Sequence, residues 1–210
     1  MDNPVSAESQ NKDTLIYKAT TSWNSISRYK YAFTYGYKKQ LHTIMLSFEP
    51  EQFPHLIGFQ YLNDLSLPYY NGKKLISMVL DGSFHQDLIE KSQNYVEMIE
   101  PRLVALCSLE EILSSPFTLF SYRPEMYGSF KTNLKADYLI SSEINGISFV
   151  FLVGGNPKSL VRECICRTVF IKGERNYEEN QRPYALLKKV RISLDTNTET
   201  VLFIKEGFSE

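Results

Sequence analysis

The sequence Y-K-Y-A-F-T-Y-G-Y at residues 29–37 alternates aromatic side chains with smaller or polar ones. Aromatic residues at every second position are typical of a β-strand with one buried face. Residues 40–48 predict a second strand, in which His42 shares a face with Ile44 and Leu46 and is expected in the core. The short turn between the strands predicts a hairpin. The aromatic row could also stack on bases, but we favour a buried sheet face.

The stretch Phe53-Pro54-His55-Leu56-Ile57-Gly58 follows this hairpin. Pro54 fixes its own φ and biases the preceding residue toward an extended shape. Gly58 allows the backbone to approach a neighbour or a ligand closely. Between them, His55 can exchange a proton near neutral pH. The sequence leaves two interpretations open: a general acid or base in a cleft, or a histidine that hydrogen-bonds in the core.

The rest of the chain predicts helices and then strands. Apolar residues recur at helical spacing between residues 75 and 113, and Pro101 must kink or restart a helix there. Asn145-Gly146 is the strongest hairpin signal in the chain. Strands are predicted on either side of it and further on, at residues 137–144, 147–153, 161–171, 190–194 and 200–204.

These patterns predict one α+β domain over residues 28–210. Its antiparallel sheet would combine the N-terminal aromatic hairpin with C-terminal strands, packed with a helical middle segment. Residues 1–27 are predicted to be an N-terminal arm. Within this arm, residues 14–27 form a short helix or an irregular segment with Trp23 as a packing anchor.

Composition indicates an ordinary globular protein. The chain has 210 residues, of which 43% are hydrophobic and 22% charged, with a formal net charge of −1. This charge excludes a strong overall attraction to nucleic acid but allows a local basic patch. Three cysteines and the lack of a signal peptide favour a reducing compartment. We therefore expect a cytoplasmic protein without a membrane partner, since its apolar runs are too short to span a bilayer.

No common cofactor or metal motif occurs in the sequence. A P-loop, G-x-G-x-x-G, H-E-x-x-H and G-x-S-x-G are all missing, and the three histidines are scattered. We therefore expect no metal, no nucleotide and no other cofactor. What remains is acid–base chemistry on phosphates. RNA carries its own nucleophile, the 2′-hydroxyl, so a protein needs to add only proton transfer and cations around the phosphate.

Basic side chains are concentrated in residues 158–191, which contain nine Lys and Arg residues but only four Glu residues. This excess suits phosphates, and the alternative is a chance fluctuation of surface charge. On the first interpretation, we expect the substrate to contact Lys158, Arg162, Tyr184 and Lys188.

Several segments together resemble the phage-type branch of the barnase–EndoU–colicin–RelE-like nuclease superfamily. The resemblance covers roughly residues 28–192, and its most specific part is the Phe-Pro-His-Leu-x-Gly element. The remaining parts are Leu88-Ile89-Glu90-Lys91-Ser92, Arg102, Ala136-Asp137-Tyr138-Leu139-Ile140 and Cys166-Arg167-Thr168.

The resemblance implies an α+β fold and metal-independent endoribonuclease activity of the phage, mobile-element or toxin type. His55 matches the motif histidine, and Arg167 with Thr168 matches polar positions on a later strand. From the residues alone, Arg167 belongs either to a phosphate site or to an internal ion pair with Glu163. RNA is the expected partner, and a cognate inhibitor protein is a further candidate. The alternative function is a non-catalytic module that binds nucleic acid or protein.

Overall fold

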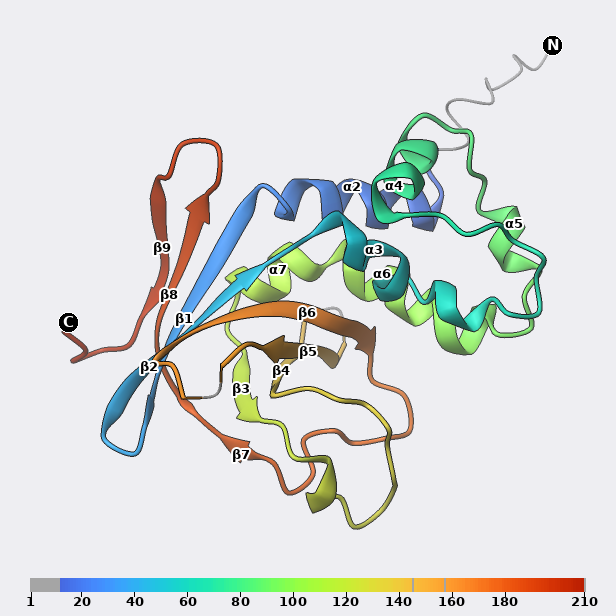
Figure 1. The fold of residues 1–210 in the computed structure, drawn as a ribbon. Helices are drawn as coiled ribbons and strands as arrows, with labels where there is room; N and C mark the ends of the chain where they lie inside the picture. Colours follow the sequence, from blue (N-terminus) through green and yellow to red (C-terminus); the bar gives the residue numbers. More distant parts are fainter. Residues whose placement is uncertain (1–11, 145, 157, 210) are drawn as a thin grey trace.

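The computed structural model describes residues 12–144, 146–156 and 158–209 (Figure 1). Within them, nine strands form one curled sheet in the order β7-β3-β4-β5-β6-β2-β1-β8-β9. Neighbouring strands are antiparallel except β2 and β6, which run parallel. This confirms the predicted single α+β domain with a mainly antiparallel sheet. The strands are β1 Tyr29–Tyr37, β2 Gln40–Ser47, β3 Thr118–Ser121, β4 Tyr138–Ser142, β5 Ser148–Gly154, β6 Val161–Ile171, β7 Arg182–Pro183, β8 Ala185–Ser193 and β9 Glu199–Ile204.

The helices cover one face of this sheet (Figure 1). Pro101 lies in the first turn of α6, so a helix restarts at this point as predicted. The helices are α2 Leu15–Ile26, α3 Phe53–Leu56, α4 Gly72–Leu80, α5 Asp87–Glu90, α6 Glu100–Cys107 and α7 Leu109–Ser114. Single turns add 3-10 segments η1 Pro50–Gln52, η2 Phe59–Tyr61 and η4 Pro124–Met126, and the π-helical segment η3 Tyr95–Ile99.

The aromatic hairpin forms as predicted from β1 and β2. Phe33 and Tyr35 are buried on one face of β1, so the aromatic row belongs to the core. The two turn residues, Lys38 and Lys39, both adopt left-handed conformations with φ of 49° and 63°. His42 is half-buried and stacks on Tyr35 with ring centroids 5.5 Å apart, so it is less enclosed than expected. The second predicted hairpin forms from β4 and β5, although Asn145 in its turn lies outside the described residues.

Helix α2 belongs to the core rather than to the arm predicted for residues 1–27. The Thr14 hydroxyl caps its first turn by accepting a hydrogen bond from the Tyr17 amide. Trp23 is completely buried, and its ring lies 5.4 Å from Phe48 and 5.9 Å from Phe53. Trp23 is thus the packing anchor that the sequence indicated. Residues 1–11 of the predicted arm lie outside the described residues.

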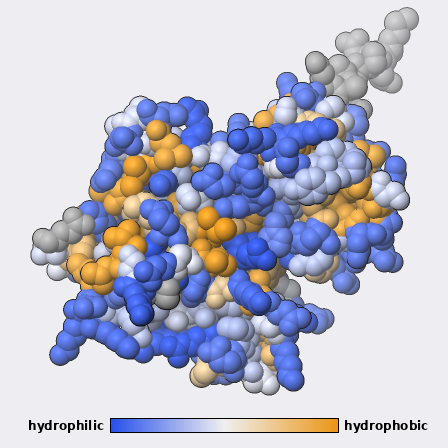
Figure 2. Space-filling view, in the orientation of Figure 1, coloured by the Kyte–Doolittle hydropathy of each residue, from blue (hydrophilic) through white to orange (hydrophobic). Residues whose placement is uncertain are grey.

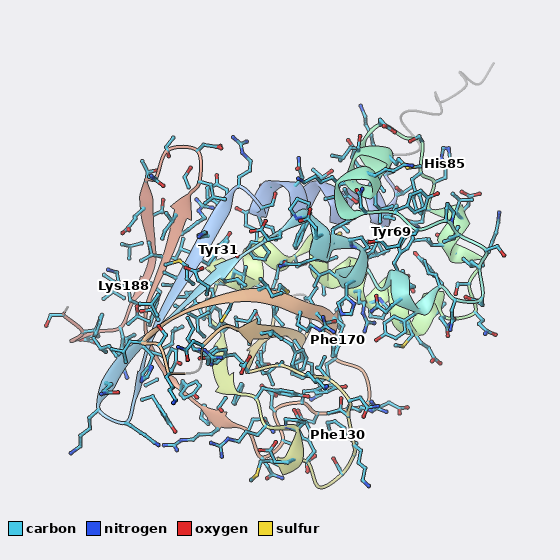
Figure 3. The ribbon with its side chains drawn as sticks, in the orientation of Figure 1. Tyr31, Tyr69, His85, Phe130, Phe170 and Lys188 are labelled. Carbon is cyan, nitrogen blue, oxygen red and sulfur yellow. The ribbon has the colours of Figure 1, made fainter. Side chains whose placement is uncertain are left out.

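The opposite face of the sheet has its own aromatic core, built on β3, β4 and β5. Phe149 and Phe151 are fully buried there, under Tyr177 and Phe130. These two covering residues come from the β6–β7 and β3–β4 connections, and Figure 3 labels Phe130 below the sheet. Long connections therefore cover the apolar side chains on this face of the sheet, as the helices cover those on the other face.

The β8–β9 end of the molecule exposes apolar side chains, which Figure 2 shows as an apolar area at this end. Val201, Phe203 and Ile204 on the edge strand β9 are 52%, 38% and 51% exposed. Among the described residues, no helix combines the length and the hydropathy that crossing a bilayer requires.

Candidate active site

Strands β2 and β6 diverge, and this divergence creates the site. They pair only from Thr43 and Val161 to Ser47 and Ile165. Strand β6 then continues to Ile171, whereas the chain after β2 turns away into η1 and α3. Helices α3 and α6 both contact β6. The second half of β6 therefore has helices α3 and α6 beside it where β2 would otherwise continue.

A cleft of about 980 Å³ opens along this second half of β6. Its walls come from α3, η2, η3, the start of α6, residues 132–135 and residues 167–177. His55, Arg167 and Thr168, the three residues that the sequence nominated for catalysis, line it together. Phe170, labelled in Figure 3, marks the same end of β6.

A β-bulge places Arg167 in the cleft wall. Phe151 of β5 pairs with Thr168 and Leu152 pairs with Cys166, so Arg167 has no partner in the ladder. A bulge of this kind bends the strand and re-aims side chains. It also reverses the alternation: Cys166 faces the helical layer before the bulge, whereas Thr168 lies opposite Phe151 on the other face after it.

His55 is half-buried, and its surroundings hold its pKa below the ordinary value of 6.5. Burial is the main cause, and the positive charges of Arg167 and Arg102 add to it. These two cations disfavour a second positive charge on the ring. At neutral pH the imidazole is therefore uncharged and able to accept a proton.

Arg102 is the most buried cation that lines the cleft, with 7% of its surface exposed. In the sequence, only the family resemblance pointed to this residue. Its guanidinium lies 4.7 Å from the Tyr61 ring centroid and 5.5 Å from that of Phe170. It donates hydrogen bonds to the Met98 carbonyl oxygen and, at 3.4 Å, to the Tyr61 hydroxyl. No carboxylate among the described residues forms an ion pair with it. Burial lowers the pKa of Arg102.

Two buried polar atoms of this cleft lack a hydrogen-bond partner among the described residues. One is Nε of Arg102 and the other is Oγ1 of Thr168, a residue that is 4% exposed. Buried polar groups are normally satisfied, so unsatisfied ones at a cleft indicate a missing polar ligand. Basic side chains also outnumber acidic ones in the cleft lining. The basic residues are Arg102, Lys135, Arg167 and Arg175, and the acidic ones are Glu97 and Glu174. An anion suits both features.

Gly58 makes room for Arg102, in line with the close approach that the sequence predicted. It adopts a left-handed conformation with φ of 86°. A Cβ atom here would lie 2.9 Å from Cδ1 of Ile99 and 3.1 Å from both Cδ of Arg102 and the carbonyl oxygen of Met98. The turn that carries His55 is thereby packed directly against the helix that carries Arg102.

The other four nominated residues lie away from the cleft. Arg162 is buried in a polar network: it donates to the Tyr138 hydroxyl at 2.8 Å and to the Gly155 carbonyl at 3.1 Å, and pairs with Asp137 at 3.3 Å. Its two terminal nitrogens, Nη1 and Nη2, are engaged in this network. None of the four lines the cleft: Lys158, Arg162, Tyr184 and Lys188.

Tyr184 packs against Tyr35 with ring centroids 4.5 Å apart. Lys188 lies on β8, at the left of Figure 3. Lys158 lies in the connection between β5 and β6 and is exposed. The alternative ion pair between Arg167 and Glu163 does not form. The Glu163 carboxylate lies instead near Lys30, with 3.9 Å between Oε2 and Nζ.

A comparison with protein families identifies the fold. The family described as phage-Barnase-EndoU-ColicinE5/D-RelE like nuclease4 matches residues 15–206. The chain belongs to this nuclease family. The match confirms the resemblance and extends it to helix α2 and strand β9. Searches of curated proteins and of solved structures found no match.

Membership of this nuclease family implies that a nucleic acid is the substrate. Among the described residues, no three His, Cys, Asp or Glu side chains cluster as they would to hold a metal ion. The polar side chains that line the cleft include one imidazole, three guanidiniums, the hydroxyl of Thr168 and two tyrosine side chains.

Proposed function

We propose that this nuclease-family protein is a metal-independent endoribonuclease whose active site is the cleft beside β6. One observation carries the proposal: an uncharged imidazole and two guanidiniums without acidic partners line the same cleft from separate elements. A phosphodiester supplies the negative charge that Arg102 and Arg167 lack.

His55 acts as the general base in this proposal. It accepts the proton of the RNA 2′-hydroxyl, whose oxygen attacks the adjacent phosphorus. A bond from phosphorus to the 2′-oxygen forms as the bond to the 5′-oxygen breaks, and the departing oxygen takes a proton from water in the open cleft. The products are a 2′,3′-cyclic phosphate and a 5′-hydroxyl end.

Arg102 and Arg167 bind the non-bridging phosphate oxygens. Charge accumulates on these oxygens as phosphorus becomes five-coordinate, so fixed cations there stabilise the transition state more than the substrate. The hydroxyl of Thr168 donates a hydrogen bond to the same phosphate, which would satisfy its oxygen atom. The lowered pKa of His55 fits the role of base, because a protonated ring could not accept the 2′-hydroxyl proton.

The test is cleavage of a single-stranded RNA with EDTA present. We expect wild-type protein to cut it and His55→Gln to lose about 10²- to 10⁴-fold in rate, the usual contribution of a general base. His85→Gln is the matched control, because His85 is exposed and lies near α4 and α5 (Figure 3). A single 2′-deoxy substitution in the RNA should block cleavage at that position.

Unchanged cleavage by His55→Gln, or cleavage at the 2′-deoxy position, would overturn this mechanism. Binding of RNA without cleavage by wild-type protein would favour the non-catalytic module instead.

A further inference from the structure

A second and smaller cleft, of about 350 Å³, lies at the tip of the β1–β2 hairpin. Residues 36–41 form one wall and residues 182–184, which include strand β7, form the other. It shares no lining residue with the candidate active site. In Figure 1 the hairpin tip lies at the end of the molecule away from α3.

The charged side chains of this hairpin cleft are all basic. Lys38, Lys39 and Arg182 line it, and no Asp or Glu does. Lys38 Nζ lies 5.3 Å and the Arg182 guanidinium 5.6 Å from the ring centroid of Tyr37. No described carboxylate forms an ion pair with any of the three. Two of the cations are thus held around one aromatic ring with their charge uncompensated.

The backbone of the turn carries strain that packing does not explain. Lys38 and Lys39 both have positive φ, in a two-residue turn where Asn-Gly is the favoured sequence. A side chain with a Cβ atom makes the left-handed conformation unfavourable. Both lysines are exposed, so neither gains a buried contact in return. Strain of this kind, found first in the structure, is a reason to look for a function.

Aromatic surface adjoins the cations. The rings of Tyr37 and Tyr184 line the cleft, with centroids 5.5 Å apart, and both residues are half-buried. Cations beside exposed aromatic surface are the combination that holds single-stranded nucleic acid, whose phosphates pair with the charges while bases stack on the rings. An acidic peptide would use the charges but not the rings.

We propose that this hairpin cleft is an exosite for single-stranded RNA, which holds a part of the strand distant from the scissile phosphate. This inference rests on the proposed function for the choice of RNA over other nucleic acids. The exosite raises the affinity for long strands and leaves the cleavage step in the main cleft unchanged.

The test uses the double substitution Lys38→Asn and Lys39→Gly in a His55→Gln background, which keeps the RNA intact. The substitution removes two charges and installs the favoured turn sequence, so the protein should unfold at the same or a higher temperature. Affinity for a single strand of about 30 nucleotides should fall about tenfold, and the slope of log K against log salt should weaken by about 1.4, or 0.7 for each lost phosphate contact.

The matched control is Lys73→Gln with Lys74→Gln, which removes two exposed charges at the start of α4. It should leave affinity and salt dependence close to those of the parent. In the cleavage-competent protein, the hairpin substitution should leave the rate on a dinucleotide unchanged.

Equal affinity of the hairpin variant and its parent would overturn the exosite, as would an equal loss in the control. A larger loss of binding to poly-glutamate than to RNA would assign the cleft to an acidic protein instead. Binding does not depend on cleavage, so a protein that binds RNA through the hairpin but never cuts it would overturn the proposed function and keep the exosite.

Discussion

At the scale of single residues, the cleft places two guanidiniums near an imidazole and so disfavours a positive charge on that ring. The pKa of His55 is lowered by burial and by Arg167 and Arg102. We predict that Arg167→Gln raises the pKa of His55 relative to wild type, because one repelling charge is gone. An NMR titration of the His55 ring would measure this. An unchanged or lower pKa in the variant would show that Arg167 does not act on the ring.

The same shift makes stability depend on pH. Below the ordinary value of 6.5, the unfolded chain binds a proton at His55 that the folded chain resists. The free energy of unfolding therefore falls as the pH is lowered from about 6.5 toward the folded pKa, and this contribution stops changing below it. Urea denaturation across this range should show that His55→Gln reduces the fall; an equal fall in wild type and variant would show that His55 does not cause it.

Arg102 gives a prediction that separates stability from binding. Arg102→Met removes a buried charge that has no acidic partner, so we expect the variant to be as stable as wild type or more stable. Its cleavage of RNA should fall about 10²- to 10³-fold, the range seen when a transition-state donor is lost. Added inorganic phosphate should raise the melting temperature of wild type more than that of the variant. An equal rise in both proteins would show that phosphate binds elsewhere.

At the scale of elements, the turn after α3 is fixed by its close contact with η3 and α6. We predict that Gly58→Ala destabilises the protein by about 1–3 kcal/mol, because the residue is left-handed and its Cβ atom would press on Ile99 and on the Met98 carbonyl. The added Cβ atom would push on η3 and on α6, the helix that carries Arg102. Cleavage activity should therefore fall even where the variant is fully folded. Chemical denaturation and a cleavage assay on the folded protein check both parts. Gly128→Ala is the control, because only Glu179 Oε1 lies within 4 Å of its Cβ position, at 3.7 Å, and Gly128 does not line the cleft.

The sequence was most informative where a pattern is local. Alternating aromatics predicted β1, and Asn-Gly predicted the β4–β5 hairpin, because period and turn chemistry act over a few residues. The placement of His55 beside Arg167 depends on the parallel pairing of β2 with β6, which joins strands more than 100 residues apart in the sequence and leaves no local signal.

Arg102 could have been noticed from its spacing. It lies three residues after Ile99 and four before Leu106, on the apolar face of the predicted helix, where an arginine is out of place. By contrast, the basic segment 158–191 was misleading as one surface. Arg162 and Lys189 within it are buried, and Arg191 is paired with Glu110 at 3.0 Å. Charge counted along a chain does not show which side chains face solvent.

At the scale of the whole molecule, Lys189 joins the far part of the sheet to the helical layer. It is 2% exposed on β8 and donates to the carbonyl oxygens of Leu113, Ser114 and Ser115 at the end of α7. We predict that Lys189→Met destabilises the protein by about 2–4 kcal/mol, because these buried carbonyls lose their donor. Thermal unfolding would measure the loss, with Lys205→Met, a substitution of an exposed lysine, as comparison. A loss below about 1 kcal/mol would mean that other donors replace the ammonium.

The bulge at Arg167 gives β6 one position where the chain can be shortened without turning the strand over. Removing Arg167 would join Cys166 directly to Thr168 and restore regular pairing with β5, while Thr168 to Ile171 keep their partners and their faces. A deletion elsewhere in β6 has no such spare residue at its own position and must move side chains to the opposite face. A scan of single-residue deletions along β6 should therefore find the smallest loss of stability at Arg167, with the guanidinium removed from the cleft and the rest of the strand unchanged.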